Sequence, residues 1–487
     1  MQSLLHLFSL TLVAVVGVCI VAVQPFPILH DFPEWMYQGW LAHHLLFGDY
    51  EAVTDLYALA NYPVPNSITQ FGIAVLNLIG SPIDSGRIWL AIYLAYASVL
   101  WLVLSRQLLY AQARSCNGQT RSRGTGHDGA INLLLTMTIT FGPGFWNGYA
   151  NFQFALLFWG TYLLAMRLRR DGVLAHLFLS LMIFFSHASV FIAFVVLVIA
   201  RVFYSQLGWR YLTAIFPSII LFVWYLLATI RFDEIVQLNS FGLQEWLQYK
   251  VYTVAKQGYF HNFIIADGSS LLGNVHIVYM AGVALNLSVA VIIVAWLLYM
   301  GWHLLKAFVP LSFSSAGTKT NEEKTSKDKT SDEKTSDEEN RVSIVNRRIT
   351  FTALLAMLIV FLAAGKDNFG VVNLGERFLI AALVLVLVQL RCHRWIRHVW
   401  VSLAAIGAVY TMVAVIKVTG YPVEAYSVAR STTSGTLDGA IDDIYAASRH
   451  KLFNHRLYIY ADHGIWLQTQ DADLLPLKHI TSFIVPK

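Results

Sequence analysis

The sequence predicts an all-α polytopic membrane protein with about eleven transmembrane helices. Of the 487 residues, 56% are hydrophobic and 13% are charged, whereas soluble domains carry about 25% charged residues. Fourteen of the charged residues lie between Lys319 and Arg341, which leaves too few elsewhere to cover a soluble surface. Apolar runs long enough to cross a bilayer also recur along the chain. These observations exclude a soluble enzyme and a secreted domain.

Charge and cysteine content narrow the class further. A polytopic membrane protein is not expected to bind nucleic acid. The formal net charge of +5 is modest, and the distribution of the charges is more informative than their sum. The three cysteines, Cys19, Cys116 and Cys392, are odd in number and far apart in the sequence. They therefore indicate no disulfide framework.

Eleven apolar segments approach the length of about 20 residues that a helical span needs. They are Leu4–Leu29, Ser85–Leu109, Ala130–Phe145, Phe152–Met166, Val173–Phe185, Ala188–Phe203, Tyr211–Ile230, Val275–Leu305, Ile349–Ala364, Phe378–Leu390 and Val399–Val418. The first segment has no basic region before it, so we expect a retained anchor rather than a signal peptide. The shorter stretch Ile68–Gly80 is expected to form a helix that lies at the membrane interface.

The distribution of Lys and Arg predicts the orientation of these spans. No Lys or Arg precedes Arg87, and basic clusters recur at every second connection. With eleven helices and a cytoplasmic N-terminus, all of these clusters fall on the cytoplasmic side. The loop 30–69 and the tail 419–487 then share the outer side. We expect a multi-pass protein of the bacterial inner membrane with a periplasmic C-terminus; the endoplasmic reticulum is the eukaryotic counterpart.

Two segments differ in composition from the predicted transmembrane domain, residues 1–418. The segment 314–341 is rich in Lys, Glu, Asp, Ser and Thr, and we expect a disordered cytoplasmic linker there because it lacks apolar residues for a core. The tail 419–487 contains aromatic and β-branched runs such as Arg456–Tyr460. These runs predict a small extracytoplasmic α/β lobe.

The first outer loop, 30–69, holds the strongest candidates for chemistry. Asp31 and Glu34 directly follow the first span, and a carboxylate at that boundary can serve as a general base or bind a divalent metal. Trp35 and the aromatic residues after it are expected to anchor an interfacial helix in the headgroup zone. The alternative is that these acids only solvate an outer loop.

A second group of candidates lies at short outer turns. Asn147 and Asn151 follow Gly and Pro residues that break a helix, and either side chain could contact substrate or cap a helix. His187 follows an apolar run, where a structural role is the alternative. Lys366, Glu376 and Arg377 flank the last outer loop. A guanidinium there suits a lipid phosphate, and the alternative for Arg377 is an ion pair with an acid such as Glu376.

The order of these features resembles the GT-C superfamily of integral membrane glycosyltransferases, such as protein O-mannosyltransferases and lipid A aminoarabinose transferases. The resemblance lies in an outer loop that opens with Asp31-x-x-Glu34, in two interfacial helices separated by the segment Tyr62-Pro-Val-Pro-Asn-Ser67, and in an outer C-terminal lobe. The segment Asn147–Phe152 and His187 look similar to uncharacterised bacterial members. The resemblance covers most of the chain as architecture, and its motifs are short.

The resemblance implies transfer of a sugar from a polyprenyl-phosphate donor to an acceptor hydroxyl on the outer face, with inversion. The acceptor would be a lipid, a glycan or a protein. It assigns the base to Asp31, with Glu34 as second choice, and the cation for the leaving phosphate to Arg377, with Lys366 in reserve. Aromatic residues of the first loop, such as Trp35, would stack on the sugar or hold the isoprenoid. Some members use Mg²⁺ or Mn²⁺ and others use no metal, and no metal ligand is assigned here.

Three other functions are compatible with a polytopic chain. A transporter or flippase of lipid-linked saccharides usually has charged residues near the middle of its spans, and the apolar segments here contain almost none. An O-antigen polymerase or ligase usually has a large late outer loop with arginines, whereas the loop Gly365–Arg377 is short. A membrane scaffold without enzymatic activity is the third alternative.

Overall fold

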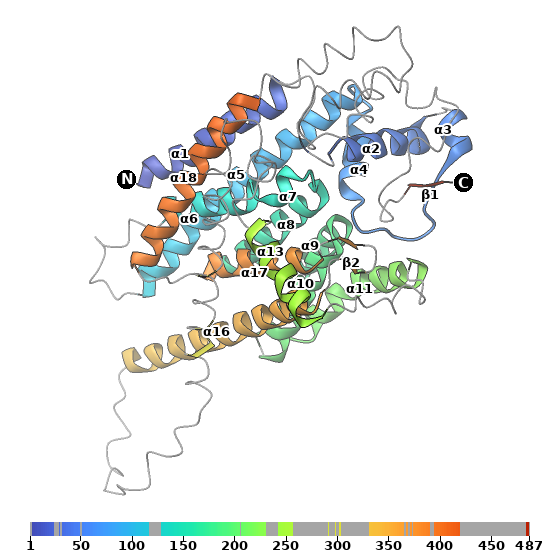
Figure 1. Ribbon diagram of the computed structural model, residues 1–487. Helices are drawn as coiled ribbons and strands as arrows, with labels where there is room; N and C mark the ends of the chain where they lie inside the picture. The colour runs from blue at the N-terminus through green and yellow to red at the C-terminus, as the bar shows by residue number, and fades with distance from the viewer. Residues whose placement is uncertain are drawn as a thin grey trace, which may run out of the picture.

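The computed structural model describes residues 2–23, 29, 32–48, 51–115, 128–204, 206–229, 242–256, 291, 298, 301–302, 331–364, 367–368, 371–372, 374–389, 394–418 and 484–486. Almost all of this part of the chain is helical (Figure 1). Asp31 and Lys366 lie outside the described residues. So do residues 419–483 of the expected C-terminal lobe and most of the expected span Val275–Leu305.

Most of the helices follow the apolar segments of the sequence. They are α1 (Gln2–Gly17), continued by a π-helical turn over Val18–Ala22, α2 (Phe32–Phe47), α3 (Glu51–Leu56), α4 (Ile68–Leu76), α5 (Pro82–Ser115), α6 (Asp128–Leu135), continued by a π-helical turn over Thr136–Thr140, α7 (Pro143–Trp146), α8 (Ala150–Arg167), α9 (Val173–Ser186), α10 (Ala188–Phe203), α11 (Arg210–Thr229), α13 (Leu243–Lys256), α16 (Ser331–Ala363), α17 (Leu374–Gln389) and α18 (Arg394–Val418).

Three of these helices are long and apolar enough to cross a membrane. The candidate spans are Leu4–Ala22, Pro82–Gln107 and Arg210–Thr229. Shorter apolar helices cover Val173–Ser186, Ala188–Phe203 and Arg348–Ala363. The predicted helical class is therefore confirmed for the described residues. By length and composition, three of these helices are candidates to cross a membrane, and the number of about eleven spans stays a prediction.

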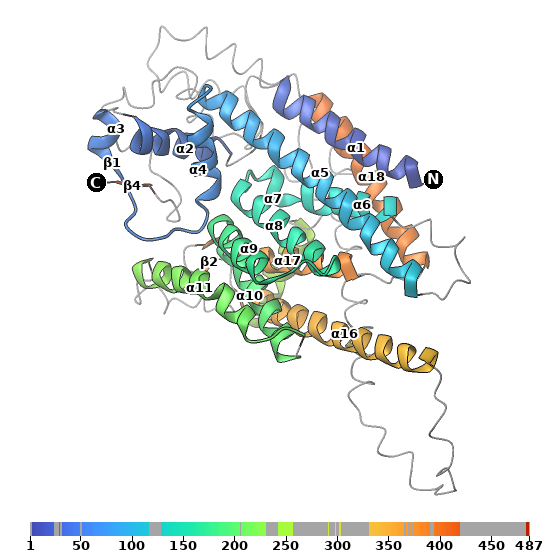
Figure 2. The same ribbon diagram turned by 180° about the vertical axis from the view of Figure 1, so that it is seen from behind.

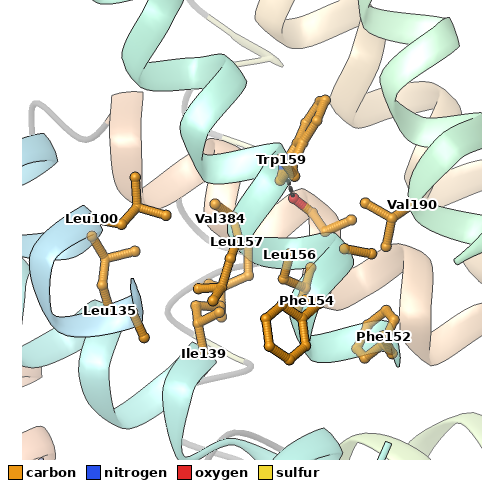
Figure 3. Close-up of a cluster of buried hydrophobic side chains, with 14 of the residues drawn as sticks. Leu100, Leu135, Ile139, Phe152, Phe154, Leu156, Leu157, Trp159, Val190 and Val384 are labelled. Carbon is orange, nitrogen blue, oxygen red and sulfur yellow. Dashed lines mark hydrogen bonds between the residues drawn. The ribbon is translucent and has the colours of Figure 1, made fainter. Parts of the chain in front are cut away.

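Helix α8 is the centre of the packing. It contacts α5, α9, α10 and α17, and Leu156 and Leu157 of α8 lie in a cluster with side chains from these and neighbouring helices (Figure 3). A Cβ atom on Gly160 would lie 2.6 Å from the ring of Trp101, so this glycine lets α5 and α8 approach closely. The indole of Trp159 donates a hydrogen bond to the carbonyl of Ala381 in α17, at 3.3 Å.

A buried ion pair lies at the C-terminal ends of α8 and α10. Nη1 of Arg201 donates to Oδ2 of Asp171 at 2.6 Å and to the hydroxyl of Tyr162 at 2.9 Å. The Tyr162 hydroxyl lies 3.0 Å from Nε2 of His176. The side chain of Arg201 is 9% exposed, so its charge is balanced within the helices rather than by water.

Helices α2, α3 and α4 gather with strand β1 (Tyr57–Leu59) at one end of the molecule (Figures 1 and 2). Helix α2 packs along α4, and both were expected as helices from the loop 30–69 and the stretch Ile68–Gly80. Phe71 and Ile79 on the α4 side are 53% and 79% exposed. Such exposed apolar side chains suit a helix that contacts lipid at the membrane boundary.

The last described residues of the chain pair with this group. Strand β4 (Ile484–Pro486) lies antiparallel to β1, and Ala58 is opposite Val485. Ile484 is 1% exposed, and β4 also contacts α2. The C-terminal end of the chain therefore lies beside the first loop. A second antiparallel pair, β2 (Asp367–Asn368) and β3 (Val371–Val372), lies between α16 and α17.

The structure contradicts one expectation at the end of the linker 314–341. Helix α16 begins at Ser331, so residues 331–341 are helical rather than disordered. Glu and Lys have high helix propensity, and the apolar run that ends at Ala363 continues the same helix, which supplies the tertiary packing that a short charged segment lacks. Residues 314–330 lie outside the described residues.

The strand pairing predicts a specific cross-link. In a background with the three native cysteines replaced by alanine, Ala58→Cys and Val485→Cys should form a disulfide on mild oxidation, because directly opposed Cβ atoms lie about 4.5–5.5 Å apart. The pair Ala58→Cys with Ile484→Cys is the control, since neighbouring strand residues point to opposite faces. Cross-linking is measured in native membranes: the chain is cleaved by a protease between the two cysteines, and a disulfide keeps the two fragments together on a non-reducing gel. Equal cross-linking of both pairs would contradict the pairing.

Candidate functional site

The residues of the candidate site gather around a turn between two helices. The helical backbone that begins with α6 ends at Thr140, and Gly142 and Pro143 start the short helix α7. Gly148 then adopts a φ of 73°, a left-handed conformation that glycine tolerates without strain. This turn delivers the 147–152 segment, which comprises residues 147 to 152, to the N-terminal end of α8. The Gly and Pro residues predicted this break in the sequence.

The first-loop helix α2 contacts the turn through Trp35. Nε1 of Trp35 donates a hydrogen bond to the carbonyl of Gly148 at 2.9 Å. Trp35 is 5% exposed, so its ring is buried against protein and its indole N–H has a protein partner; its position in the headgroup zone stays a prediction. Glu34 lies in the first turn of α2, where the helix dipole favours a negative charge, and is 3% exposed.

A chain of carboxamides links Glu34 to α8. Nε2 of Gln38 lies 3.4 Å from Oε1 of Glu34, and Oε1 of Gln38 accepts a hydrogen bond from Gln70 at 3.1 Å. Nδ2 of Asn151 donates to Oε1 of Gln70 at 3.1 Å and to the carbonyl of Asn66 at 2.7 Å. These side chains are almost fully buried. Buried polar groups that are paired in this way stiffen the contact between α2, α4 and α8.

Asn151 also caps a helix other than its own. Oδ1 of Asn151 accepts a hydrogen bond from the backbone N–H of Thr69 at 2.9 Å, in the first turn of α4. The first N–H groups of a helix have no partner within that helix, so Asn151 satisfies one of them from α8. The turn before α4 is held from another side as well, because the N–H of Ser67 donates to the carbonyl of Phe185 at 2.9 Å. Capping is therefore the role that the structure gives Asn151.

Arg377 reaches the same segment from the first turn of α17. Its Nη1 lies 2.5 Å from Nε2 of His187, and its Cζ lies 5.0 Å from the ring centroid of Tyr149 and 6.0 Å from that of Phe152. A guanidinium over an aromatic face is a favourable cation–π contact. His187 precedes α10, is 4% exposed and packs edge-on against Phe152. Burial lowers the pKa of His187 well below its ordinary value of 6.5, and the charge of Arg377 lowers that pKa further.

Glu376 lies beside a second cation. Nζ of Lys250 in α13 donates to the backbone carbonyls of Phe361 and Ala364 at the end of α16, where a positive charge complements the helix dipole. Burial lowers the pKa of Lys250, and the carboxylate of Glu376 opposes that shift. Glu376 is 9% exposed. Its charge therefore acts on Lys250, a residue that the sequence analysis did not single out.

The structure brings most of the predicted site residues to one place. Asn151 is part of the 147–152 segment, and Glu34, Trp35, His187 and Arg377 contact this segment or are linked to it through hydrogen bonds. Asn147 is the half-buried C-cap of α7, and Glu376 precedes Arg377. Asp31, which comes directly before the first residue of α2, and Lys366 lie outside the described residues.

Several residues of the site were missed in the sequence. Gln38 and Gln70 complete the carboxamide chain, and Tyr149 supplies the ring beneath Arg377. Two signals were available in the sequence: Gln70 is a polar residue within the apolar stretch Ile68–Gly80, and Gln38 follows Glu34 by four positions. In a helix the second spacing places two side chains on one face.

The arrangement offers two kinds of chemistry. A guanidinium held over aromatic rings can bind a phosphate, and a carboxylate in a largely apolar setting can accept a proton. Among the described residues, no three His, Cys, Asp or Glu side chains lie close enough together to hold a metal ion. Comparisons of the chain with known protein families, with curated proteins and with solved structures found no match.

The carboxamide chain predicts a measurable loss of stability. Asn151→Ala removes the acceptor of the Thr69 N–H and strips Gln70 and the Asn66 carbonyl of a donor, so we expect a cost of about 1–3 kcal/mol. Thermal unfolding of the purified protein in detergent measures it. The matched control is Asn147→Ala at the half-buried C-cap of α7, which should unfold close to the wild-type temperature. Equal effects of the two substitutions would contradict the capping role of Asn151.

Proposed function

We propose that this protein is an inverting membrane glycosyltransferase that moves a sugar from a polyprenyl-phosphate donor to an acceptor hydroxyl at the outer face of the membrane. One observation carries the proposal: the first-loop helix α2, which carries Glu34, and Arg377 of α17 meet on the 147–152 segment, through Trp35 and Tyr149. A phosphate-binding cation and a proton-accepting carboxylate are the two groups that this reaction needs most.

Arg377 is the proposed ligand of the donor phosphate. A phosphate leaving group has a low pKa, so it requires stabilisation of negative charge more than it requires a proton. The planar guanidinium suits a phosphate diester because it can donate two parallel hydrogen bonds. Lys366, close before Arg377 in the chain, is the reserve candidate for this role.

Asp31 is the proposed general base, with Glu34 as second choice. The acceptor oxygen attacks the anomeric carbon of the donor sugar, and the bond between that carbon and the phosphate oxygen breaks. The electron pair of the broken bond leaves on polyprenyl phosphate, and the hydroxyl proton passes to the carboxylate. A single displacement of this kind inverts the anomeric centre and passes through an oxocarbenium-like state. The Gln38 contact of Glu34 favours a supporting role for that residue.

The membrane setting completes the proposal. An isoprenoid donor is dissolved in the bilayer, so a site at the ends of apolar helices meets both the lipid donor and an acceptor in water. With about eleven spans and a cytoplasmic N-terminus, the first loop, the start of α17 and the C-terminal tail share the outer side. The proposed home is the bacterial inner membrane. The acceptor is a lipid, a glycan or a protein, and Mg²⁺ or Mn²⁺ is a candidate cofactor if the site outside the described residues supplies ligands.

The test is sugar transfer by the full chain reconstituted in lipid. A set of labelled polyprenyl-phosphate sugars is supplied with membrane extract as the source of acceptor, with and without a chelator. We expect Asp31→Asn to lower transfer by about 100-fold to 10,000-fold, since it removes the base. Arg377→Ala should lower it by about 100-fold to 1,000-fold, since it removes charge stabilisation. Glu34→Gln decides which carboxylate is the base.

Two controls make the result specific. Arg210→Ala removes an exposed arginine that stacks on Tyr211 outside the site, and it should leave transfer unchanged. Arg377→Lys keeps the charge but not the paired hydrogen bonds, so it should recover only part of the activity. The proposal would be contradicted if the labelled sugar stayed on its carrier while the carrier lipid moved across the membrane of sealed vesicles. That result would indicate a flippase.

A further inference from the structure

The contact between Arg377 and His187 joins two groups that can both carry a positive charge. Nη1 of Arg377 lies 2.5 Å from Nε2 of His187. A guanidinium has five N–H donors and no acceptor, so His187 must present a lone pair at Nε2. The imidazole is therefore neutral, and its proton lies on Nδ1.

Ser189 supports this tautomer from the first turn of α10. Its Oγ lies 2.8 Å from Nδ1 of His187 and accepts the Nδ1–H. The backbone N–H of Ser189 is also directed at Nδ1, at 3.3 Å. This N–H and the Arg377 N–H compete for the one acceptor nitrogen of a neutral imidazole. The Arg377 contact is the shorter one and is charge-assisted, so we assign the acceptor to Nε2 and the proton to Nδ1. Because the ring is buried and packed against Phe152, its orientation is set on both sides.

We propose that His187 is a positioning residue for the donor phosphate: its neutral imidazole holds Arg377 over Tyr149, and protonation of His187 displaces Arg377 and weakens donor binding. This inference rests on the proposed function, because it takes Arg377 as the phosphate ligand. A guanidinium can bond the imidazole and a phosphate oxygen together, since its donors point outward in one plane. Against an imidazolium it would instead meet a second cation in a site of low dielectric, where like charges repel strongly.

The direction of the pH effect follows from the groups around the contact. Helix α17 contributes Arg377 and, one residue earlier, Glu376; the turn before α8 contributes Tyr149; and α10 contributes Ser189, which does not titrate in this range. Burial and Arg377 both lower the pKa of His187 below 6.5. A histidine whose pKa is lowered in the folded protein is fully neutral above its ordinary pKa. The contacts that need the neutral ring are lost as the pH falls through the pKa of the folded state. Donor binding is therefore expected to be intact at neutral pH and to fail well below pH 6.5.

The test is equilibrium binding of a radiolabelled probe, the methyl ester of a polyprenyl phosphate, to the full chain in lipid nanodiscs over a range of pH. This phosphodiester keeps one negative charge throughout, so the probe itself does not titrate. For the wild type, we expect Kd to rise by up to about tenfold for each pH unit below the pKa of His187, because binding must release one proton. His187→Asn keeps an acceptor oxygen but cannot titrate, so it should bind at neutral pH and lose the acid-dependent rise.

Ser189→Ala provides a second variant that does not alter the imidazole. It removes the acceptor of the Nδ1–H. The imidazolium donates this proton more strongly than the neutral ring does, so the substitution destabilises the protonated form more and should move the acid-dependent rise towards lower pH. If Kd rose equally at acid pH in the wild type and in His187→Asn, the titrating group would lie elsewhere. That result would contradict the role of His187 but not the proposed function. Absence of probe binding to the wild type at every pH would overturn the proposed function instead.

Discussion

The left-handed turn at Gly148 is the constraint on which the candidate site depends. Because Gly148 has a φ of 73°, the chain can reverse after α7 and enter α8 with the 147–152 segment at the end of the helix bundle. Its carbonyl receives Trp35 from α2, and the next residue, Tyr149, lies beneath Arg377 from α17. A side chain at this position would force a strained backbone, with a cost of the order of 1–3 kcal/mol.

Helix α8 transmits this constraint to the rest of the fold. Its buried face packs against α5, α10 and α17, and Gly160 allows the close approach of Trp101. Polar contacts hold both of its ends: the Asn151 carboxamide bonds α4 at one end, and the Tyr162 hydroxyl bonds the Arg201 guanidinium at the other. Inside a bilayer, packing and such interhelical hydrogen bonds replace the hydrophobic effect as the source of helix association. A rigid α8 therefore keeps α2 and α17 at a fixed separation.

The sequence predicted helices well where an apolar run was decisive. The stretch Ile68–Gly80 and the first-loop helix are present as α4 and α2, because their pattern and flanking prolines leave little choice. Tertiary contacts were less accessible. The carboxamide chain needs Gln38, Gln70 and Asn151 from three separate helices, and no local pattern indicates that they meet. The same limit explains Trp35, whose aromatic character suits the headgroup zone and the interior equally well.

Charged residues predicted the position of candidate site residues but not the start of α16 or the contacts between side chains. The charged segment before Arg341 looked like a linker because it has no apolar residues, yet its Glu and Lys content extends α16 back to Ser331. Residue type and position at a helix end indicate Arg377 and His187 as separate candidates. Their direct contact is a property of the packing of α10 against α17. It joins two separately predicted candidates in one site, where we propose that Arg377 binds the donor phosphate.

The most direct measurement of the central claim is photoaffinity labelling with a polyprenyl phosphate that carries a diazirine on the carbon beside the phosphate. The full chain in membranes is irradiated with the probe, digested and mapped by mass spectrometry, with excess unlabelled polyprenyl phosphate as the competitor. The account predicts competed label on the 147–152 segment or on the first turn of α17 around Arg377. Competed label only at distant positions, such as the helix ends around Arg201, would contradict it.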